Sequence, residues 1–129
     1  MGRRTLYRQA DERGVIEVMQ EPSGVRTLHF GSVSKQSSVD PQAPHRLVLP
    51  YTRVLTAALL FHPQPRRILL LGLGGGALVH FFLHHFPQAT VEAVESWPRV
   101  ASVARDYFHL PEGHPRLRVH LAEAADFLA

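Results

Sequence analysis

The stretch Arg67-Ile68-Leu69-Leu70-Leu71-Gly72-Leu73-Gly74-Gly75-Gly76 decides the fold of this chain. After its arginine, the segment 67–71 is continuously apolar, which is expected of a parallel strand covered by helices on both faces. The glycines follow at once, and residues 77–86 predict a helix that Pro87 ends. Glycine between a buried strand and a helix lets the backbone approach a ligand and leaves the first N–H groups of the helix free to face it.

Downstream of this stretch, strands and helices alternate. Residues 90–95 and 116–121 have the apolar pattern of two further strands, residues 98–109 predict a helix between them, and residues 123–128 predict the start of another helix. Short connections between such elements imply right-handed crossovers and a parallel sheet. The predicted fold class is α/β, a partial doubly wound (Rossmann-like) parallel sheet with a small N-terminal β-hairpin unit.

The residues upstream predict a smaller antiparallel unit. Residues 14–20 and 25–30 alternate apolar and polar positions on either side of a short turn, which is typical of a β-hairpin. The polar stretch 31–50 predicts a loop with a short strand at residues 32–34. Residues 51–61 then predict a helix that ends at a proline-rich segment.

These elements divide the chain in two. Residues 1–50 form the predicted β-hairpin and loop unit, and residues 51–129 the first half of a Rossmann-like nucleoside-binding domain. In a doubly wound sheet the first strand is central, with strands two and three on one side and the fourth on the other. With three predicted strands, residues 67–71 lie at an edge, which is an aggregation hazard. We therefore expect a fragment of a longer protein or, as the alternative, a homodimer that covers this edge.

Composition and charge exclude several classes of function. A chain of 129 residues with 45% hydrophobic residues is ordinary for a globular domain. Its 14 basic and 11 acidic residues are scattered, without the clustering that nucleic-acid binding requires, so we predict no nucleic-acid partner. Without cysteine the chain has no disulfide and no thiolate metal site, which is compatible with a cytoplasmic location. The polar N-terminus and the interrupted apolar stretches predict neither secretion nor a membrane span.

An acidic residue stands at the end of the second predicted strand. Glu95 follows Gly76 at the spacing of roughly 20 residues that dinucleotide-binding folds place between loop and acid. A carboxylate there accepts hydrogen bonds from the ribose hydroxyls of a nucleoside. Gly72, Gly74 and Gly76 occupy G-x-G-x-G positions, although a purely structural turn has the same pattern. The loop's place between strand and helix, together with the acid, favours a nucleoside site.

Several segments together resemble the spermidine synthase (polyamine aminopropyltransferase) superfamily. They are residues 67–78, Val94-Glu95, residues 103–111 and, upstream, Gln36-Ser37 and residues 50–53. The resemblance covers residues 14–128 and implies decarboxylated S-adenosylmethionine or methylthioadenosine as ligand, a polyamine as a second partner, and aminopropyl transfer to an amine. Because methyltransferases share the glycine loop and the acid, a methyltransferase that uses S-adenosylmethionine is one alternative. A non-catalytic binding or assembly module of the same fold is another.

The resemblance also implies roles for individual residues. Those that it assigns to the cofactor are Gln36, Gly72, Gly74, Gly75, Gly76, Glu95 and Glu123. The glycines line the sulfonium and ribose side, Glu95 binds the ribose hydroxyls, and Gln36 reaches the nucleoside from the N-terminal loop. Glu123 stands where the family commonly has an aspartate that binds the adenine amino group, and its side chain is one methylene longer. Tyr51 is a candidate for hydrogen bonding to the substrate, with packing as the alternative.

The sequence departs from the family in two places. Ser96-Trp97 follows Glu95, where the family commonly has Ile-Asp, so Trp97 either stacks on adenine or caps the edge between helix and sheet. The family's catalytic aspartate lies after a fourth strand, beyond Ala129, so no catalytic residue is assigned. Asp40 on the N-terminal loop is a candidate for the cleft, but an aspartate before proline is more often a turn former.

Two histidines have the spacing of metal ligands. His80 and His84 lie four positions apart on the predicted helix after the glycine loop, which places them on one face. Two nitrogen ligands alone do not make a tight site, and the alternative is an exposed helix face. We therefore predict no metal site.

Overall fold

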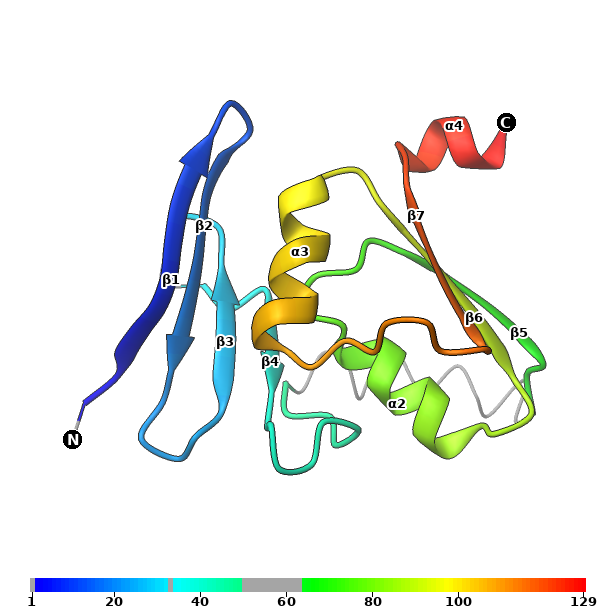
Figure 1. Ribbon diagram of the computed structural model, residues 1–129, viewed down its shortest axis with the longest axis horizontal. Helices are drawn as coiled ribbons and strands as arrows, with labels where there is room; N and C mark the ends of the chain where they lie inside the picture. The colour runs from blue at the N-terminus through cyan, green and yellow to red at the C-terminus, as the bar shows by residue number, and fades with distance from the viewer. Residues whose placement is uncertain (1, 33, 50–63) are drawn as a thin grey trace.

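The structure is a computed structural model that describes residues 2–32, 34–49 and 64–129 (Figure 1). The described residues form a four-stranded antiparallel sheet and a three-stranded parallel sheet. Helix α3 (Pro98–Tyr107) lies between the two sheets, as Figure 1 shows. The predicted α/β class with a small N-terminal β unit is confirmed.

The N-terminal sheet is larger than the predicted hairpin. Each strand is antiparallel to the next, and the strands are β1 (Arg4–Asp11), β2 (Gly14–Gln20), β3 (Arg26–His29) and β4 (Ser37–Val39). The β2–β3 hairpin agrees with the prediction, and the Gly24 N–H donates to the Glu21 carbonyl at 2.8 Å in its turn. Strand β1 was not predicted, because a β-bulge between Thr5 and Tyr7 breaks the alternation of its residues.

Residues 32 and 34 do not belong to a strand, so the prediction of a short strand at residues 32–34 is wrong. The fourth strand lies further along the chain, where Ser37 and Ser38 pair with Leu28 and Thr27 of β3. All three residues of β4 are buried, including both serines. A polar sequence thus forms a buried strand because its backbone pairs with β3, and no apolar alternation marks it in the sequence.

Helix α3 contributes to two hydrophobic cores. Val100, Val103 and the following Phe108 pack with β2 and β3 of the N-terminal sheet. Ala101 and Ala104, on the other side of the helix, pack with the parallel sheet. Small residues on one face and larger ones on the other let a single helix join the two sheets.

The parallel sheet has the predicted order. Its strands are β5 (Arg67–Leu71), β6 (Thr90–Glu95) and β7 (Leu117–Leu121), with β6 in the middle. Val91 of β6 pairs with Ile68 of β5 and with Leu117 of β7, so the three strands end level with one another. Helix α2 (Ala77–His85) connects the first two strands, and α3 connects the second and third. The first strand therefore lies at an edge of the described sheet, as expected.

Among the residues that the structure describes, helices α2 and α3 cover one face of β5. Ile68 and Leu70 pack against the core beneath α2 and α3. Leu69 and Leu71 point to the opposite face and are 42% and 54% exposed. On that face the described helix α4 (Ala124–Leu128) lies at β6 and β7, where the Phe127 ring is 4.8 Å from the His120 ring. An apolar strand sequence shows that both faces of the strand can be buried. Whether they are buried depends on which other elements pack against them.

The helices end near their predicted limits. Helix α2 ends at His85 and is capped by Phe86, one residue before Pro87. Helix α3 ends at Tyr107, earlier than predicted, because His109 adopts a left-handed φ of 58°. The predicted helix over residues 51–61 lies outside the described residues. None of the helices that the structure describes is long and apolar enough to cross a bilayer.

Candidate functional site

The carboxyl ends of the three parallel strands meet at one edge of the sheet. The Gly72 N–H donates to the Val94 carbonyl at 2.7 Å, and the Ala122 N–H donates to the Glu95 carbonyl at 3.0 Å. The strand ladder thus continues into the segments that follow each strand. In open α/β sheets, ligands bind in the crevice outside these carboxyl ends.

The glycine loop presents bare backbone at this edge. Gly72 has a φ of 96°, a conformation that favours glycine, and a Cβ built there meets nothing within 4 Å. The backbone of Gly72 therefore borders open space, as a residue beside a ligand must. Gly76 precedes α2, and its N–H donates to the Leu73 carbonyl at 2.9 Å, which closes the turn.

Gly75 has a different role in the same loop. A Cβ built on it lies 2.8 Å from Ser37 Oγ and 3.1 Å from Phe108. The absence of a side chain at Gly75 therefore allows the loop to pack against β4 and the end of α3. This contact also brings the segment that carries Gln36 next to the glycine loop. Gln36 is exposed, and its backbone N–H donates to the Leu28 carbonyl at 2.8 Å.

Glu95 holds the loop and the next helix in place. Its Oε1 accepts the Leu73 N–H and its Oε2 accepts the Trp97 N–H, both at 3.0 Å. A carboxylate has about four lone-pair positions, so each oxygen keeps capacity for a further donor. The side chain is half-buried, and two backbone amides from different segments fix its orientation. Glu95 thus links the glycine loop to the residue before α3, and it is also a preoriented hydrogen-bond acceptor.

Glu123 lies beyond the end of β7 and precedes α4. Its side chain is 64% exposed, and Oε1 lies 3.8 Å from Nη2 of Arg13. Arg13 comes from the turn between β1 and β2, and it also donates to the Ser96 carbonyl and to Ser96 Oγ. Sequence reasoning missed Arg13, because an isolated arginine in a hairpin turn does not reveal a contact so distant along the chain.

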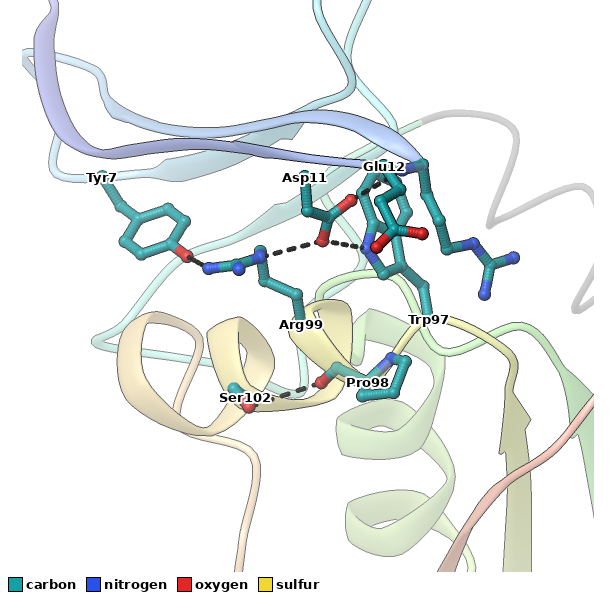
Figure 2. Close-up of a pocket in the computed structure, with 8 residues that line it drawn as sticks. Tyr7, Asp11, Glu12, Trp97, Pro98, Arg99 and Ser102 are labelled. Atoms are coloured by element: carbon teal, nitrogen blue, oxygen red, sulfur yellow. Dashed lines mark hydrogen bonds and ion pairs between the residues drawn. The ribbon is translucent and has the colours of Figure 1, made fainter.

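Trp97 caps the edge between helix and sheet. It is the residue before α3, and its indole Nε1 donates to Asp11 Oδ2 at 2.8 Å (Figure 2). Its ring also lies 5.5 Å from the Phe30 ring. Of the two alternatives for Trp97, the structure supports capping, because the indole is engaged by the N-terminal sheet.

Asp11 is the centre of the polar cluster in Figure 2. It accepts from Trp97 and, at 3.0 Å, from Arg99 Nε, while Arg99 Nη1 donates to the Tyr7 hydroxyl at 3.1 Å. The hydrogen bonds from the Trp97 indole and the Arg13 backbone N–H lower the pKa of Asp11 from 3.8 to about 2. These side chains line a cavity of about 490 Å³ between the β1–β2 turn and α3. Their polar groups bond one another, so the cluster connects the N-terminal sheet to α3.

Two other candidates from the sequence stay outside this arrangement. Tyr51 lies outside the described residues. Asp40 accepts the Gln42 backbone N–H at 3.0 Å and pairs with Arg46 at 2.9 Å. The carboxylate of Asp40 is therefore used within its own turn, in agreement with the turn-former alternative.

The histidines of α2 are only partly the exposed face that was considered. His80 is half-buried, and its ring bonds the Phe108 carbonyl at 2.7 Å, whereas His84 is exposed and stacks on His45 at 3.6 Å. Burial lowers the pKa of His80, and burial together with the neighbouring His84 and His45 lowers the pKa of His85. Among the described residues, no group of three or more potential ligands is placed to hold a metal ion.

Known proteins resemble the chain in sequence and in fold. No protein-family model matches it. Polyamine aminopropyltransferase of Chromobacterium violaceum is 39% identical over 113 residues, which cover 88% of this chain and 43% of that protein. The crystal structure of a probable spermidine synthase from Corynebacterium glutamicum has a TM-score of 0.79 at 24% identity, over 95% of this chain and 45% of that one. Human methyltransferase-like protein 13, in complex with SAH, has a TM-score of 0.57 at 31% identity, over 63% and 39%.

The chain spans less than half the length of each of these proteins. The likeness to the Corynebacterium structure establishes the fold, and the likeness to the Chromobacterium protein extends over most of the sequence. The resemblance drawn from the glycine loop and its neighbours is thus confirmed by independent comparisons of sequence and structure. Over the matched residues, the chain is a spermidine-synthase-like (polyamine aminopropyltransferase-like) segment of the S-adenosylmethionine-dependent methyltransferase fold.

Proposed function

We propose that this chain binds an adenosyl sulfonium nucleoside, decarboxylated S-adenosylmethionine or its product methylthioadenosine, at the carboxyl ends of β5, β6 and β7. The observation that carries the proposal is the carboxylate of Glu95, which the amides of Leu73 and Trp97 hold beside the glycine loop. Vicinal ribose hydroxyls are a pair of donors that suits the remaining lone pairs of such a carboxylate. The similarity to the Chromobacterium protein, a polyamine aminopropyltransferase, supports the same class of ligand.

The residues around Glu95 fit the rest of such a ligand. The open side of Gly72 gives the backbone room for the sulfonium and ribose side, and Gln36 lies on the segment that packs against the same loop. Glu123 supplies an acceptor for the adenine amino group. When bound, a sulfonium makes its neighbouring carbon susceptible to attack by an amine, and these residues orient the nucleoside around it.

The proposed function of this chain is nucleoside binding. Aminopropyl transfer to a polyamine is the chemistry that it would inherit from the family. Transfer also needs a carboxylate that accepts the proton of the attacking amine. Asp40 is bonded to Arg46 and to the Gln42 amide, so we assign it no such role. No catalytic residue is therefore proposed among the described residues.

Calorimetric titration of the chain with decarboxylated S-adenosylmethionine, methylthioadenosine and S-adenosylmethionine tests the proposal. We expect micromolar binding of the first two ligands, and loss of that binding in Glu95→Ala. Glu92→Ala is the matched control, because Glu92 lies on the same strand and pairs with His120 away from the loop. A folded chain that produces no heat with any of the three would contradict the proposed function.

A methyltransferase is the first alternative. It is favoured by the human methyltransferase-like protein, which is 31% identical over 63% of this chain and was solved with SAH. The same titration separates the two functions. Tighter binding of S-adenosylmethionine than of its decarboxylated form would favour methyl transfer, because the ligands differ only in the carboxylate.

A non-catalytic assembly module is the second alternative, and the exposure of Leu69 and Leu71 on the edge strand favours it. A homodimer whose subunits pack through this face of the edge strand would bury Leu69 and Leu71. Sedimentation velocity of the chain and of Leu71→Ser tests it. A dimer that dissociates in Leu71→Ser, together with no nucleoside binding, would establish the assembly module in place of the enzyme-like function.

A further inference from the structure

The turn of the β1–β2 hairpin reaches the carboxyl ends of β6 and β7. Arg13 in that turn donates from Nη1 to the Ser96 carbonyl and from Nη2 to Ser96 Oγ at 2.9 Å. The same Nη2 lies 3.8 Å from Glu123 Oε1. One side chain of the N-terminal sheet thus connects the segment after β6 to the segment after β7.

The backbone of this turn is held against α3. Asp11 Oδ1 accepts the Arg13 N–H at 2.8 Å, and Asp11 Oδ2 accepts from Trp97 and Arg99. Figure 2 shows Asp11 directed at Trp97 and Arg99 from the end of β1. The side chain of Arg13 therefore starts from a fixed point, and its guanidinium lies 5.7 Å from the centre of the Trp97 ring.

The Glu123 side chain is one methylene longer than that of aspartate, and it is 64% exposed. Ordering a long glutamate side chain costs rotamer freedom, so an unrestrained Glu123 is a poor acceptor for a base. Exposed ion pairs contribute little to stability, so the pair with Arg13 matters chiefly for where the carboxylate lies. Its geometry is set by Ser96, to which both terminal nitrogens of Arg13 are bonded.

We propose that Arg13 is a positioning residue for the nucleoside site, which holds the Glu123 carboxylate where it accepts the adenine amino group. The inference rests on the proposed nucleoside binding and adds a determinant of base specificity. It explains how a glutamate serves at a position where an aspartate is usual, because the hairpin arginine restricts the extra methylene.

The test is the ratio of the affinities for methylthioadenosine and for its 6-oxo analogue methylthioinosine, measured by calorimetry. In Arg13→Ala we expect this ratio to fall roughly threefold to tenfold, which corresponds to the loss of one hydrogen bond to the base. The ratio of the affinities for methylthioadenosine and its 2′-deoxy analogue should not change, because Glu95 sets it. The double variant Arg13→Ala/Glu123→Asp should regain the base preference, since the shorter acid needs less restraint.

Arg105→Ala is the matched control, because Arg105 forms an exposed ion pair with Glu112 at 3.1 Å outside the strand ends. A base ratio that is unchanged or larger in Arg13→Ala, or that the double variant does not regain, would overturn the inference while nucleoside binding stands. Binding that Glu95→Ala abolishes in the parent chain keeps the proposed function separate from this result. If the parent chain binds no nucleoside, both proposals are wrong.

Discussion

Strands β2 and β5 have similarly apolar sequences, yet they lie in different surroundings. Ile16 and Val18 of β2 are fully buried, and their neighbours alternate with them as in a strand with one covered face. Leu69 and Leu71 of β5 are exposed among the described residues, although they are at least as apolar. The difference teaches that burial depends on what packs against a strand. β2 has α3 against its core face, whereas the described helices cover β5 on one face only.

The largest expected effect comes from the core that α3 shares with β2. Phe108→Ala should cost about 3–5 kcal/mol in the free energy of unfolding, because this fully buried ring packs between the N-terminal sheet and the glycine loop. Leu71→Ala on the exposed face of β5 should cost less than about 1 kcal/mol. Urea unfolding of both variants measures the contrast. Equal losses would show that the face of β5 is covered in solution.

A smaller effect on the free energy of unfolding is expected at Glu95, which links the glycine loop to the residue before α3. Glu95→Ala removes the acceptor of two backbone amides, and we expect a loss of about 1–3 kcal/mol in the free energy of unfolding. Glu92→Ala, on the same strand, removes only a partly exposed pair with His120 and should change stability by less than about 1 kcal/mol. If Glu95→Ala is as stable as Glu92→Ala, the Leu73 and Trp97 amides do not depend on this carboxylate.

The smallest effect on stability is expected at Asp11, which connects the N-terminal sheet to α3. This effect depends on pH. The folded-state pKa of Asp11 is lowered to about 2, so its contribution to stability is present above its ordinary pKa of 3.8. This contribution is lost as the pH falls from about 4 towards about 2, because the unfolded chain takes up the proton first. Urea midpoints between pH 5 and pH 2 should fall more steeply for the parent chain than for Asp11→Asn. Parallel curves would contradict the assignment.

The sequence predicts the features that local residues determine. The apolar residues 68–71, the glycines and the strand that ends at position 95 suffice to predict β5, the loop and β6, because these elements depend on neighbours close in sequence. The bulged strand β1 and the polar strand β4 escape prediction, since their partners define them. Arg13 escapes it for the same reason, because Ser96 lies 83 positions away along the chain.

The carboxylate shared by the Leu73 and Trp97 amides has a consequence for exchange with solvent deuterium. Both amides are released only when the side chain of Glu95 leaves, so their protection factors should report one local opening. If the proposed nucleoside binds, a ribose hydroxyl on the same carboxylate should stabilise the closed form and slow exchange at both positions together. Exchange at these two amides, which belong to separate segments, would therefore report whether a ligand occupies the site at the end of β6.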